Sequence, residues 1–340
     1  MNADRVLVRL PNWLGDIVMA LPALAMVRAG FPGAHLTFAL PAAFAPIFAE
    51  RTDAAPDAVL ALKEKDQGRR SEIAKLRSVH ADLAILLTNS FGSAWIVRRA
   101  RIRERWGYRA NLRRALLTRA VRRPGGRVHQ AEYYRALMSG LDLPKAESIG
   151  RIVATAQTRA RGRALLERVG MREGTPIVGF APGAAYGQAK RWPPQRAGEV
   201  ARQLSERGIA VVLVGAAADR DAGRAIESAA PVVNLIGRTS LSELIGVIAA
   251  CETFLSNDSG AMHLAAAIGL PVVAIFGPTN ELATAPEGEH DVLTADVFCR
   301  PCMLRDCPID HRCMKRISAE RVVETILHRL NLSTSLRTSS

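Results

Sequence analysis

Apolar runs of strand length alternate with segments of helical periodicity along almost the whole of this 340-residue chain. Most of the runs are continuously apolar, which is typical of parallel strands that are covered on both faces. Strands and helices that alternate in this way form a doubly wound parallel sheet. The sequence therefore predicts an α/β fold from end to end.

The pattern occurs twice, on either side of an irregular stretch between Ala146 and Gly174. The predicted strands are Arg5–Leu10, His35–Leu40, Ala58–Leu62, Asp82–Leu87, Pro176–Phe180, Ala210–Gly215, Val232–Ile236, Thr253–Ser256 and Pro271–Phe276. The predicted helices are Asp16–Ala29, Ser71–His80, Thr158–Val169, Pro194–Arg207, Leu241–Ala250, Ala261–Ile268 and Ser318–Leu330. We predict two Rossmann-like domains, residues 1–160 and 161–332, which face a ligand-binding cleft, and a disordered tail, residues 333–340.

The positive charge of the chain is concentrated in one part of the sequence. The formal net charge is +14, and twelve arginines lie between Arg98 and Arg127 against a single acid, Glu104. Such a stretch attracts polyanions, including phospholipid head groups and phosphorylated or carboxylated glycans. The alternative is an ordinary solvated face. Nucleic acid is the weaker partner, because no aromatic interleaving, zinc-finger spacing or RNP-like motif accompanies the arginines.

No stretch approaches the roughly 18 uninterrupted apolar residues of a membrane span. The N-terminus enters a strand pattern at Arg5 without a secretory signal. These features predict a soluble, cytoplasmic protein.

The first candidate site is Asp16, which follows the first strand in the segment Leu10-Pro-Asn-Trp-Leu-Gly-Asp16. Ligands of open α/β sheets bind beyond the carboxyl ends of the strands. A carboxylate at this position can take a proton from a sugar hydroxyl as a general base. It can equally cap the N–H groups of the following helix, and the pattern alone does not separate the two roles.

The second candidate site is the segment Phe180–Pro193, which also lies between a strand and a helix. Its small residues Gly183, Ala184 and Ala185 allow backbone N–H groups to converge on an anion. Lys190 and Arg191 then offer charge for a diphosphate. The segment is not a Walker A loop, because the G-x-x-x-x-G-K-[ST] pattern is absent.

The third candidate site is the segment Phe254–His263, in which Asp258 or Ser259 caps a helix that begins near Gly260. The N-terminus of a helix carries free N–H groups and partial positive charge that suit a phosphate. His263 falls in the first turn and can face the same ligand. The next predicted strand ends in another glycine-bearing segment, Phe276-Gly-Pro-Thr279.

Two further patterns concern metals. Cys299, Cys302, Cys307 and Cys313 lie within fifteen residues, with His311 between the last two, and can hold a structural Zn²⁺ or remain free thiols. The isolated Cys251 is expected to be a small buried residue. Asp219-Arg-Asp221 has the D-x-D form of a metal-bound diphosphate site, but at the start of a helix we interpret it as a cap or a nucleotide contact.

Taken together, the three candidate segments resemble those of the lipopolysaccharide inner-core heptosyltransferases, glycosyltransferase family 9. The resembling motifs are Trp-Leu-Gly-Asp16, the Pro-Gly-Ala to Lys-Arg-Trp-Pro segment and Asn-Asp-Ser-Gly-x-Met-His263, and their order and spacing fit across nearly the whole chain. The resemblance implies a GT-B fold and an inverting transfer of L-glycero-D-manno-heptose from ADP-heptose onto heptosyl-Kdo2-lipid A. It also implies that no cofactor is required. The implied partners are the ADP-heptose donor and an anionic lipid A-core acceptor.

The resemblance also implies a role for each matching residue. Asp16 would be the general base, and Lys190 would contact the donor diphosphate or heptose. Asp258, Ser259, Gly260 and His263 would line the donor site, and Thr239 would lie near the adenine. The protein would be a monomer associated peripherally with the inner membrane, where the arginines of residues 98–127 would bind the acceptor.

Three other functions remain open on the sequence alone. A transferase of the same family with another sugar or acceptor, or a sugar-nucleotide epimerase, would keep the fold. A polyanion-binding protein would use only the arginines, and would leave Asp16, Lys190, Asp258 and His263 without a role.

Overall fold

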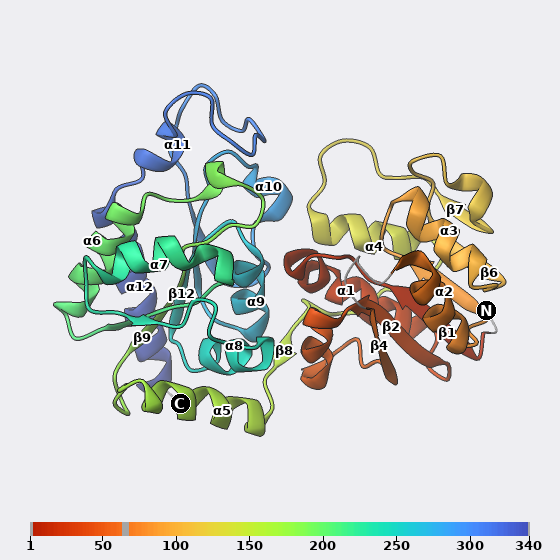
Figure 1. Cartoon of the computed structure of the whole chain (residues 1–340), viewed down its shortest axis with the longest axis horizontal. Helices are drawn as coiled ribbons and strands as arrows, with labels where there is room; N and C mark the ends of the chain where they lie inside the picture. The colour runs from red at the N-terminus through yellow and green to blue at the C-terminus, as the bar shows by residue number, and fades with distance from the viewer. Residues whose placement is uncertain (1–2, 63–67, 339–340) are drawn as a thin grey trace. The chain divides into compact units, whose positions relative to one another are not determined.

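The computed structural model describes the backbone of residues 3–62 and 68–338, and the side chains up to residue 331. The chain divides into two compact units, Met1–Val153 and Ala154–Ser340 (Figure 1).

The first unit is built on a six-stranded parallel sheet with the order β4-β2-β1-β5-β6-β7. Its strands are β1 (Arg5–Arg9), β2 (His35–Pro41), β4 (Ala58–Leu62), β5 (Leu83–Leu86), β6 (Glu104–Tyr108) and β7 (Arg119–Val121), and β3 (Arg51–Thr52) pairs separately with β8 (Ile152–Val153). Its helices are α1 (Leu14–Gly30), η1 (Ala42–Ala49), α2 (Gly68–Ser78), α3 (Phe91–Arg99), η3 (Arg114–Leu116) and α4 (Gln130–Gly140).

Helices cover both faces of this sheet. α1 packs against α4, and α2 packs against α3. Leu7 and Leu86 of the strands share one buried cluster with Leu76 of α2 and Val97 of α3. The central strands are therefore buried on both sides, which is why most of their positions, and not only every second one, are apolar.

The second unit repeats the plan, with a parallel sheet of order β11-β10-β9-β12-β13-β14. Its strands are β9 (Ile177–Ala181), β10 (Ala210–Leu213), β11 (Val233–Asn234), β12 (Thr253–Asn257), β13 (Val272–Ile275) and β14 (His290–Leu293). Its helices are α5 (Ala156–Arg168), η4 (Gln188–Lys190), α6 (Pro194–Ser205), η5 (Ala217–Asp219), α7 (Arg220–Glu227), α8 (Leu241–Ile248), α9 (Gly260–Ile268), α10 (Glu281–Thr284), α11 (Arg312–Lys315) and α12 (Ala319–Thr338).

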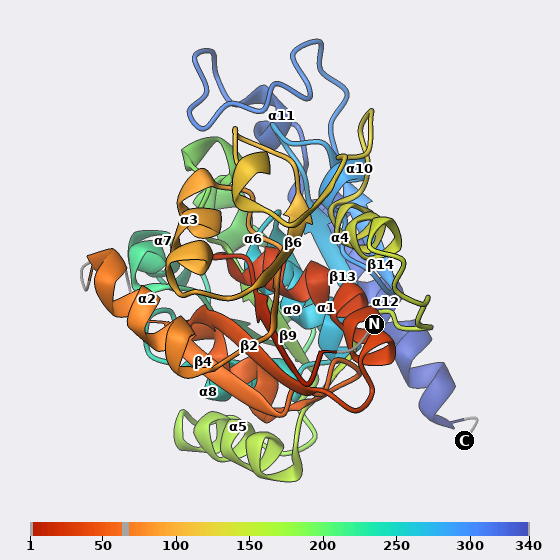
Figure 2. The ribbon, with the colours of Figure 1, turned by 90° about the vertical axis from the view of Figure 1, so that its right-hand side faces the viewer.

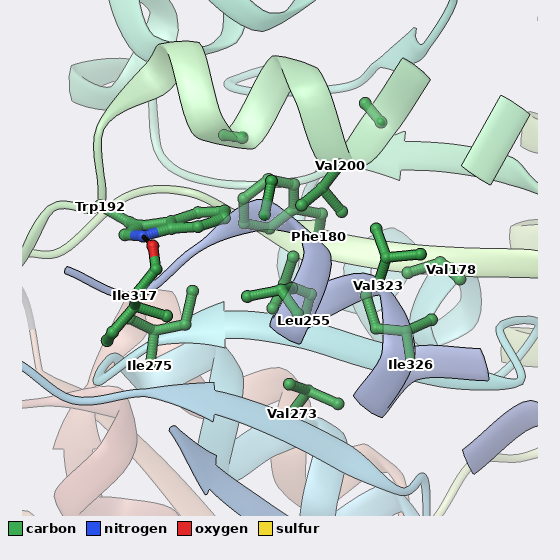
Figure 3. Packing of buried hydrophobic residues seen from close by; sticks show 14 of the residues in the cluster. Val178, Phe180, Trp192, Val200, Leu255, Val273, Ile275, Ile317, Val323 and Ile326 are labelled. Carbon is green, nitrogen blue, oxygen red and sulfur yellow. Dashed lines mark hydrogen bonds between the residues drawn. The ribbon is translucent and has the colours of Figure 1, made fainter. Parts of the chain in front are cut away.

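The core of the second unit joins the sheet to α6 and α12 (Figure 3). Phe180 of β9 and Leu255 of β12 share one buried cluster with Val200 of α6 and Ile326 of α12. The indole of Trp192 enters this core and donates from Nε1 to the Ile317 carbonyl at 3.2 Å. Because a buried indole N–H needs an acceptor, this bond helps to fix the end of the loop that carries Lys190.

The other face of the second sheet is covered by α8 and α9, and α5 packs on α8. A Cβ atom at Gly162 of α5 would lie 2.1 Å from the carbonyl carbon of Gly246 in α8. The two helices therefore approach closely only because neither has a side chain at this point.

The predicted architecture of two doubly wound α/β sheets is confirmed. The pattern did not predict β6, β7 and β14, and it ended the last helix near Leu330, whereas α12 continues to Thr338. Of the predicted tail, residues 333–338 form the last turns of α12, and residues 339–340 lie outside the described residues.

Candidate functional site

The carboxyl ends of all six strands of the second sheet lie at one edge, because the strands are parallel. The loop after β9 carries Lys190, the loop after β12 carries Asp258, and the loop after β13 carries Thr279. β9 and β13 are the two neighbours of β12 in the sheet. The predicted second and third sites are thereby brought together.

A lysine–aspartate–threonine contact lies at the centre of this edge. Lys190 Nζ lies 2.6 Å from Asp258 Oδ2. The hydroxyl of Thr279 donates to the same oxygen at 2.7 Å. The side chains of Lys190 and Asp258 are only 12% and 6% exposed, so each charge depends on the other for compensation. Asp258 therefore holds the ammonium group in one place.

The rest of the loop after β9 is fixed by two further contacts. Asn257 Nδ2 donates to the Pro182 carbonyl at 2.6 Å, and Arg191 Nη2 lies 3.1 Å from Asp219 Oδ1. Gly183 packs directly on that aspartate, since a Cβ atom there would be 2.2 Å from the Asp219 carboxyl carbon. Arg191 thus has a carboxylate partner within the protein, as does Lys190.

The N-terminus of α9 lies beside this loop. Ser259 is its N-cap residue but makes no capping hydrogen bond, because its hydroxyl contacts Ser256 Oγ at 3.0 Å instead. The first turn contains no acidic residue. The N–H groups of this turn are therefore not satisfied by the cap and can meet an anionic ligand. His263 lies in the same turn but is 5% exposed, so little of its imidazole is accessible.

The remaining predicted donor-site residues lie at the same edge of the second sheet. Gly183 and Ala184 are buried in the loop after β9, and Ala185 is exposed. Thr239 follows β11, the outermost strand on one side, and directly precedes Ser240, the N-cap of α8. The placement of Thr239 near a nucleotide base stays a prediction.

Asp16 belongs to the first unit and lies in the first turn of α1, beyond the carboxyl end of β1. The hydroxyl of Tyr134, from α4, donates to Asp16 Oδ1 at 3.2 Å. Burial, and then the charge of Asp16, raises the pKa of Tyr134 well above its usual value. The phenol therefore stays protonated and remains a donor that orients the carboxylate.

The arginines of residues 98–127 do not form one surface. Arg98, Arg99, Arg101 and Arg103 lie at the end of α3 and in the connection to β6, which is the amino edge of the first sheet. Arg109, Arg122, Arg123 and Arg127 follow β6 and β7 at the carboxyl edge, where Asp16 also lies. All eight are exposed.

Three other arginines of this stretch have internal roles. Arg113 is fully buried and donates to the carbonyls of Tyr108 and Thr88. Burial lowers the pKa of Arg113 to about 10, so it is still charged at neutral pH. Arg105 donates to three backbone carbonyls, and Arg119 pairs with Asp142.

Of the two alternatives for the cysteines, a zinc site or free thiols, the zinc site is not supported. In the part of the chain that the structure describes, no group of three or more His, Cys, Asp or Glu residues could hold a metal ion. The four cysteines are among the residues that line one cavity of about 20 Å³, but Cys302 is exposed whereas Cys313 is buried. Burial raises the pKa of Cys313, which disfavours the thiolate that a zinc ligand must provide. Cys251 is buried, as predicted.

The acids of the D-x-D pattern bond within the chain: Asp219 closes a capping box at the start of η5, but its side chain does not cap α7. Asp219 Oδ2 accepts the Ala216 N–H at 3.2 Å, and Asp221 pairs with Arg224. A separate cavity of about 260 Å³ lies between α5 and α8, at the amino end of β9, and includes Ile177 in its lining. It lies at the opposite edge of the sheet from Lys190.

Sequence reasoning did not assign a role to Tyr134, to the Arg191–Asp219 pair or to Tyr186. For Tyr186, the usable signal is an aromatic ring among small residues and cations. Nothing in the sequence relates Tyr134 to Asp16, because α4 follows strands that the pattern did not reveal.

Two doubly wound parallel sheets, the second with an uncapped helix N-terminus and a held lysine at its carboxyl edge, are typical of the GT-B class of glycosyltransferases. The chain belongs to glycosyltransferase family 9 (heptosyltransferase), whose sequence pattern matches residues 69–312.

Known proteins of this family are similar over most of their length. Lipooligosaccharide heptosyltransferase 2 of Haemophilus influenzae is 32% identical over 295 residues, which are 83% of this chain and 85% of that one. Lipopolysaccharide heptosyltransferase 2 of Salmonella typhimurium is 33% identical over 300 residues, with the same coverage. The solved ADP-heptose LPS heptosyltransferase II of E. coli matches with a TM-score of 0.82 and 29% identity, covering 97% of this chain and 99% of that one.

Within residues 3–62 and 68–338, no helix has both the length and the apolar character that crossing a membrane requires.

Proposed function

We propose that the protein transfers L-glycero-D-manno-heptose from ADP-heptose onto heptosyl-Kdo2-lipid A in the inner core of lipopolysaccharide, with inversion at the anomeric carbon. The observation that carries this function is the Lys190–Asp258 contact beside the uncapped start of α9. It occurs in a chain about a third identical to enzymes named heptosyltransferase 2.

The donor diphosphate is proposed to bind at the carboxyl edge of the second sheet. Lys190 and the N–H groups at Gly260 would neutralise the negative charge that grows on ADP as it leaves. The backbone of Asp258 and Ser259 would line the same site, and Thr239 would lie toward the adenine. This role for the chain's own cation and helix dipole requires no cofactor.

Asp16 is proposed as the general base. Inversion needs one carboxylate to take the proton from the attacking acceptor hydroxyl, whereas retention would need a second group as nucleophile. Tyr134 keeps one oxygen of Asp16 in a defined hydrogen bond at 3.2 Å. In the complex with donor and acceptor, this carboxylate would have to lie beside the acceptor hydroxyl that attacks the donor.

The acceptor is proposed to meet the carboxyl-edge arginines, Arg109, Arg122, Arg123 and Arg127. They are exposed, and topology places them at the edge that holds Asp16. Guanidinium groups bind carboxylates and phosphates well, and these are the anionic groups of Kdo and lipid A. The same charges would hold the enzyme peripherally at the cytoplasmic face of the inner membrane.

A transfer assay tests this function directly. The enzyme is incubated with ADP-heptose and either Kdo2-lipid A or heptosyl-Kdo2-lipid A, and the product mass and ADP release are measured. We expect one heptose to be added to the heptosylated acceptor only. Transfer to Kdo2-lipid A instead would reassign the acceptor, and ADP-heptose consumption without any glycolipid product would refute the transferase function.

The two sets of exposed arginines provide a matched prediction. Replacing Arg109, Arg122, Arg123 and Arg127 by glutamine should lower kcat/KM for the lipid acceptor about tenfold or more at low salt, because charge-assisted contacts with the anionic acceptor are lost at the edge that holds Asp16. The same change at Arg98, Arg99, Arg101 and Arg103 removes equal charge from the amino edge and should alter kcat/KM less than about threefold. Equal losses in both variants would contradict a specific acceptor edge.

A further inference from the structure

Residues 298–311, the cysteine-bearing segment before α11, pack on the loop that carries Lys190. The segment extends from the body of the second unit in both views (Figures 1 and 2). The N–H of Ala189 donates to the Arg305 carbonyl at 2.9 Å, and the Tyr186 hydroxyl donates to the Met303 carbonyl at 3.0 Å. The Met303 N–H in turn donates to the Pro278 carbonyl, beside Thr279, at 2.9 Å.

This packing is close enough to restrict the sequence of the loop. A Cβ atom at Gly187 would lie 2.4 Å from the Arg305 carbonyl oxygen. Gly187 is extended, with φ of 162°, so its backbone conformation does not require glycine. The close approach of the Arg305 carbonyl oxygen is what requires a glycine at this position. Residues 298–311 therefore pack closely on the loop that carries Lys190.

One aromatic ring joins two cations in this contact. Lys190 Nζ lies 4.9 Å from the centre of the Tyr186 ring, and Arg305 Cζ lies 5.1 Å from the same centre. A cation over an aromatic face at this distance is attracted by the electrons of the ring. The Tyr186 ring thus contacts both the guanidinium of Arg305 and the ammonium of Lys190.

Arg305 differs from Lys190 and Arg191 in how its charge is compensated. Lys190 is paired with Asp258, and Arg191 is paired with Asp219. Among the described residues, Arg305 has no carboxylate partner, and its side chain is exposed. A nucleoside diphosphate carries two to three negative charges, which two already compensated cations do not balance.

We propose that Arg305 is a second donor-binding cation, which the cysteine-bearing segment delivers to the diphosphate through its contact with Tyr186 and Ala189. This inference rests on the proposed donor site and adds a residue to it. Residues 298–311 are then one wall of the nucleotide-sugar site, and the segment serves as a support for the Lys190 loop and not as a metal finger.

The test measures the affinity of the full-length protein for ADP and for adenosine by calorimetry. The difference between the two affinities gives the contribution of the diphosphate. Arg305→Ala should weaken ADP binding about tenfold and leave adenosine binding within about twofold, since one charge-assisted contact is lost. Arg305→Lys should stay within about threefold of wild type for ADP.

Arg312→Ala is the matched control. Arg312 also lies over an aromatic ring of this segment, 5.0 Å from the centre of Phe298, but it is paired with Asp310 at 2.9 Å. Its loss should change neither affinity. Unchanged ADP binding in Arg305→Ala, or an equal loss for ADP and adenosine, would overturn the role of Arg305 as a diphosphate ligand. Failure of wild-type protein to bind ADP at all would instead refute the donor site itself.

Discussion

Replacing Asp16 by asparagine is expected to lower kcat for heptose transfer by about 10²–10⁴-fold, because an amide cannot accept the proton of the attacking hydroxyl. Asparagine has the same shape and keeps an oxygen that can accept the Tyr134 hydroxyl, which donates to Asp16 Oδ1 at 3.2 Å. The first turn of α1 should therefore stay intact. Affinity for ADP, measured by calorimetry, should change less than about twofold, since Asp16 lies in the other unit from the proposed donor site.

Tyr134→Phe separates orientation of the carboxylate from its chemistry. This variant removes one hydrogen bond to Asp16 but leaves the carboxylate, so kcat should fall about tenfold or less. Thermal stability of both variants should be compared, because Tyr134 is almost fully buried. Transfer by Asp16→Asn at a rate within about threefold of wild type would remove the general-base assignment.

The sequence predicted those parts of the site that depend on strand order along a parallel sheet. Lys190 and Asp258 are 68 residues apart, yet both follow strands that the apolar pattern revealed. Because parallel strands end at one edge, their meeting could be expected from the strands alone. The sequence could not predict that Lys190 is paired, since the pairing depends on side-chain positions within that edge.

The sequence was a poor guide where strands are short or charged. β6 reads Glu104-Arg-Trp-Gly-Tyr108 and lacks the continuous apolar run of a buried strand. Without β6, the arginines of residues 98–127 form one uninterrupted stretch, although the chain carries them to two opposite edges of the sheet. The zinc interpretation of the cysteines was not supported for a related reason, because spacing along the sequence does not show which cysteines are buried.

Lys190→Met is expected to weaken ADP binding by about 10–100-fold, equivalent to the roughly 1.5–3 kcal/mol of a hydrogen bond to a charged group. The ammonium lies 2.6 Å from Asp258 and is 12% exposed, so its removal also leaves a nearly buried carboxylate without a counter-charge. That loss should lower the free energy of unfolding by several kcal/mol, of the order seen when one member of a buried pair is removed. A single variant therefore cannot assign the effect on binding to lost attraction for the diphosphate.

Asp258→Asn resolves the ambiguity. It also breaks the buried ion pair, but it keeps the lysine and an oxygen that can accept from Thr279, whose hydroxyl lies 2.7 Å from Asp258 Oδ2. If the diphosphate uses the charge of Lys190, this variant should lose stability while its ADP affinity stays within about threefold of wild type. Thermal unfolding should then show a loss of stability in both variants, whereas calorimetry should show a loss of ADP affinity greater than about threefold in Lys190→Met alone. Parallel losses of binding and stability in the two variants would mean that the pair only maintains the loop, and that Lys190 does not contact the donor.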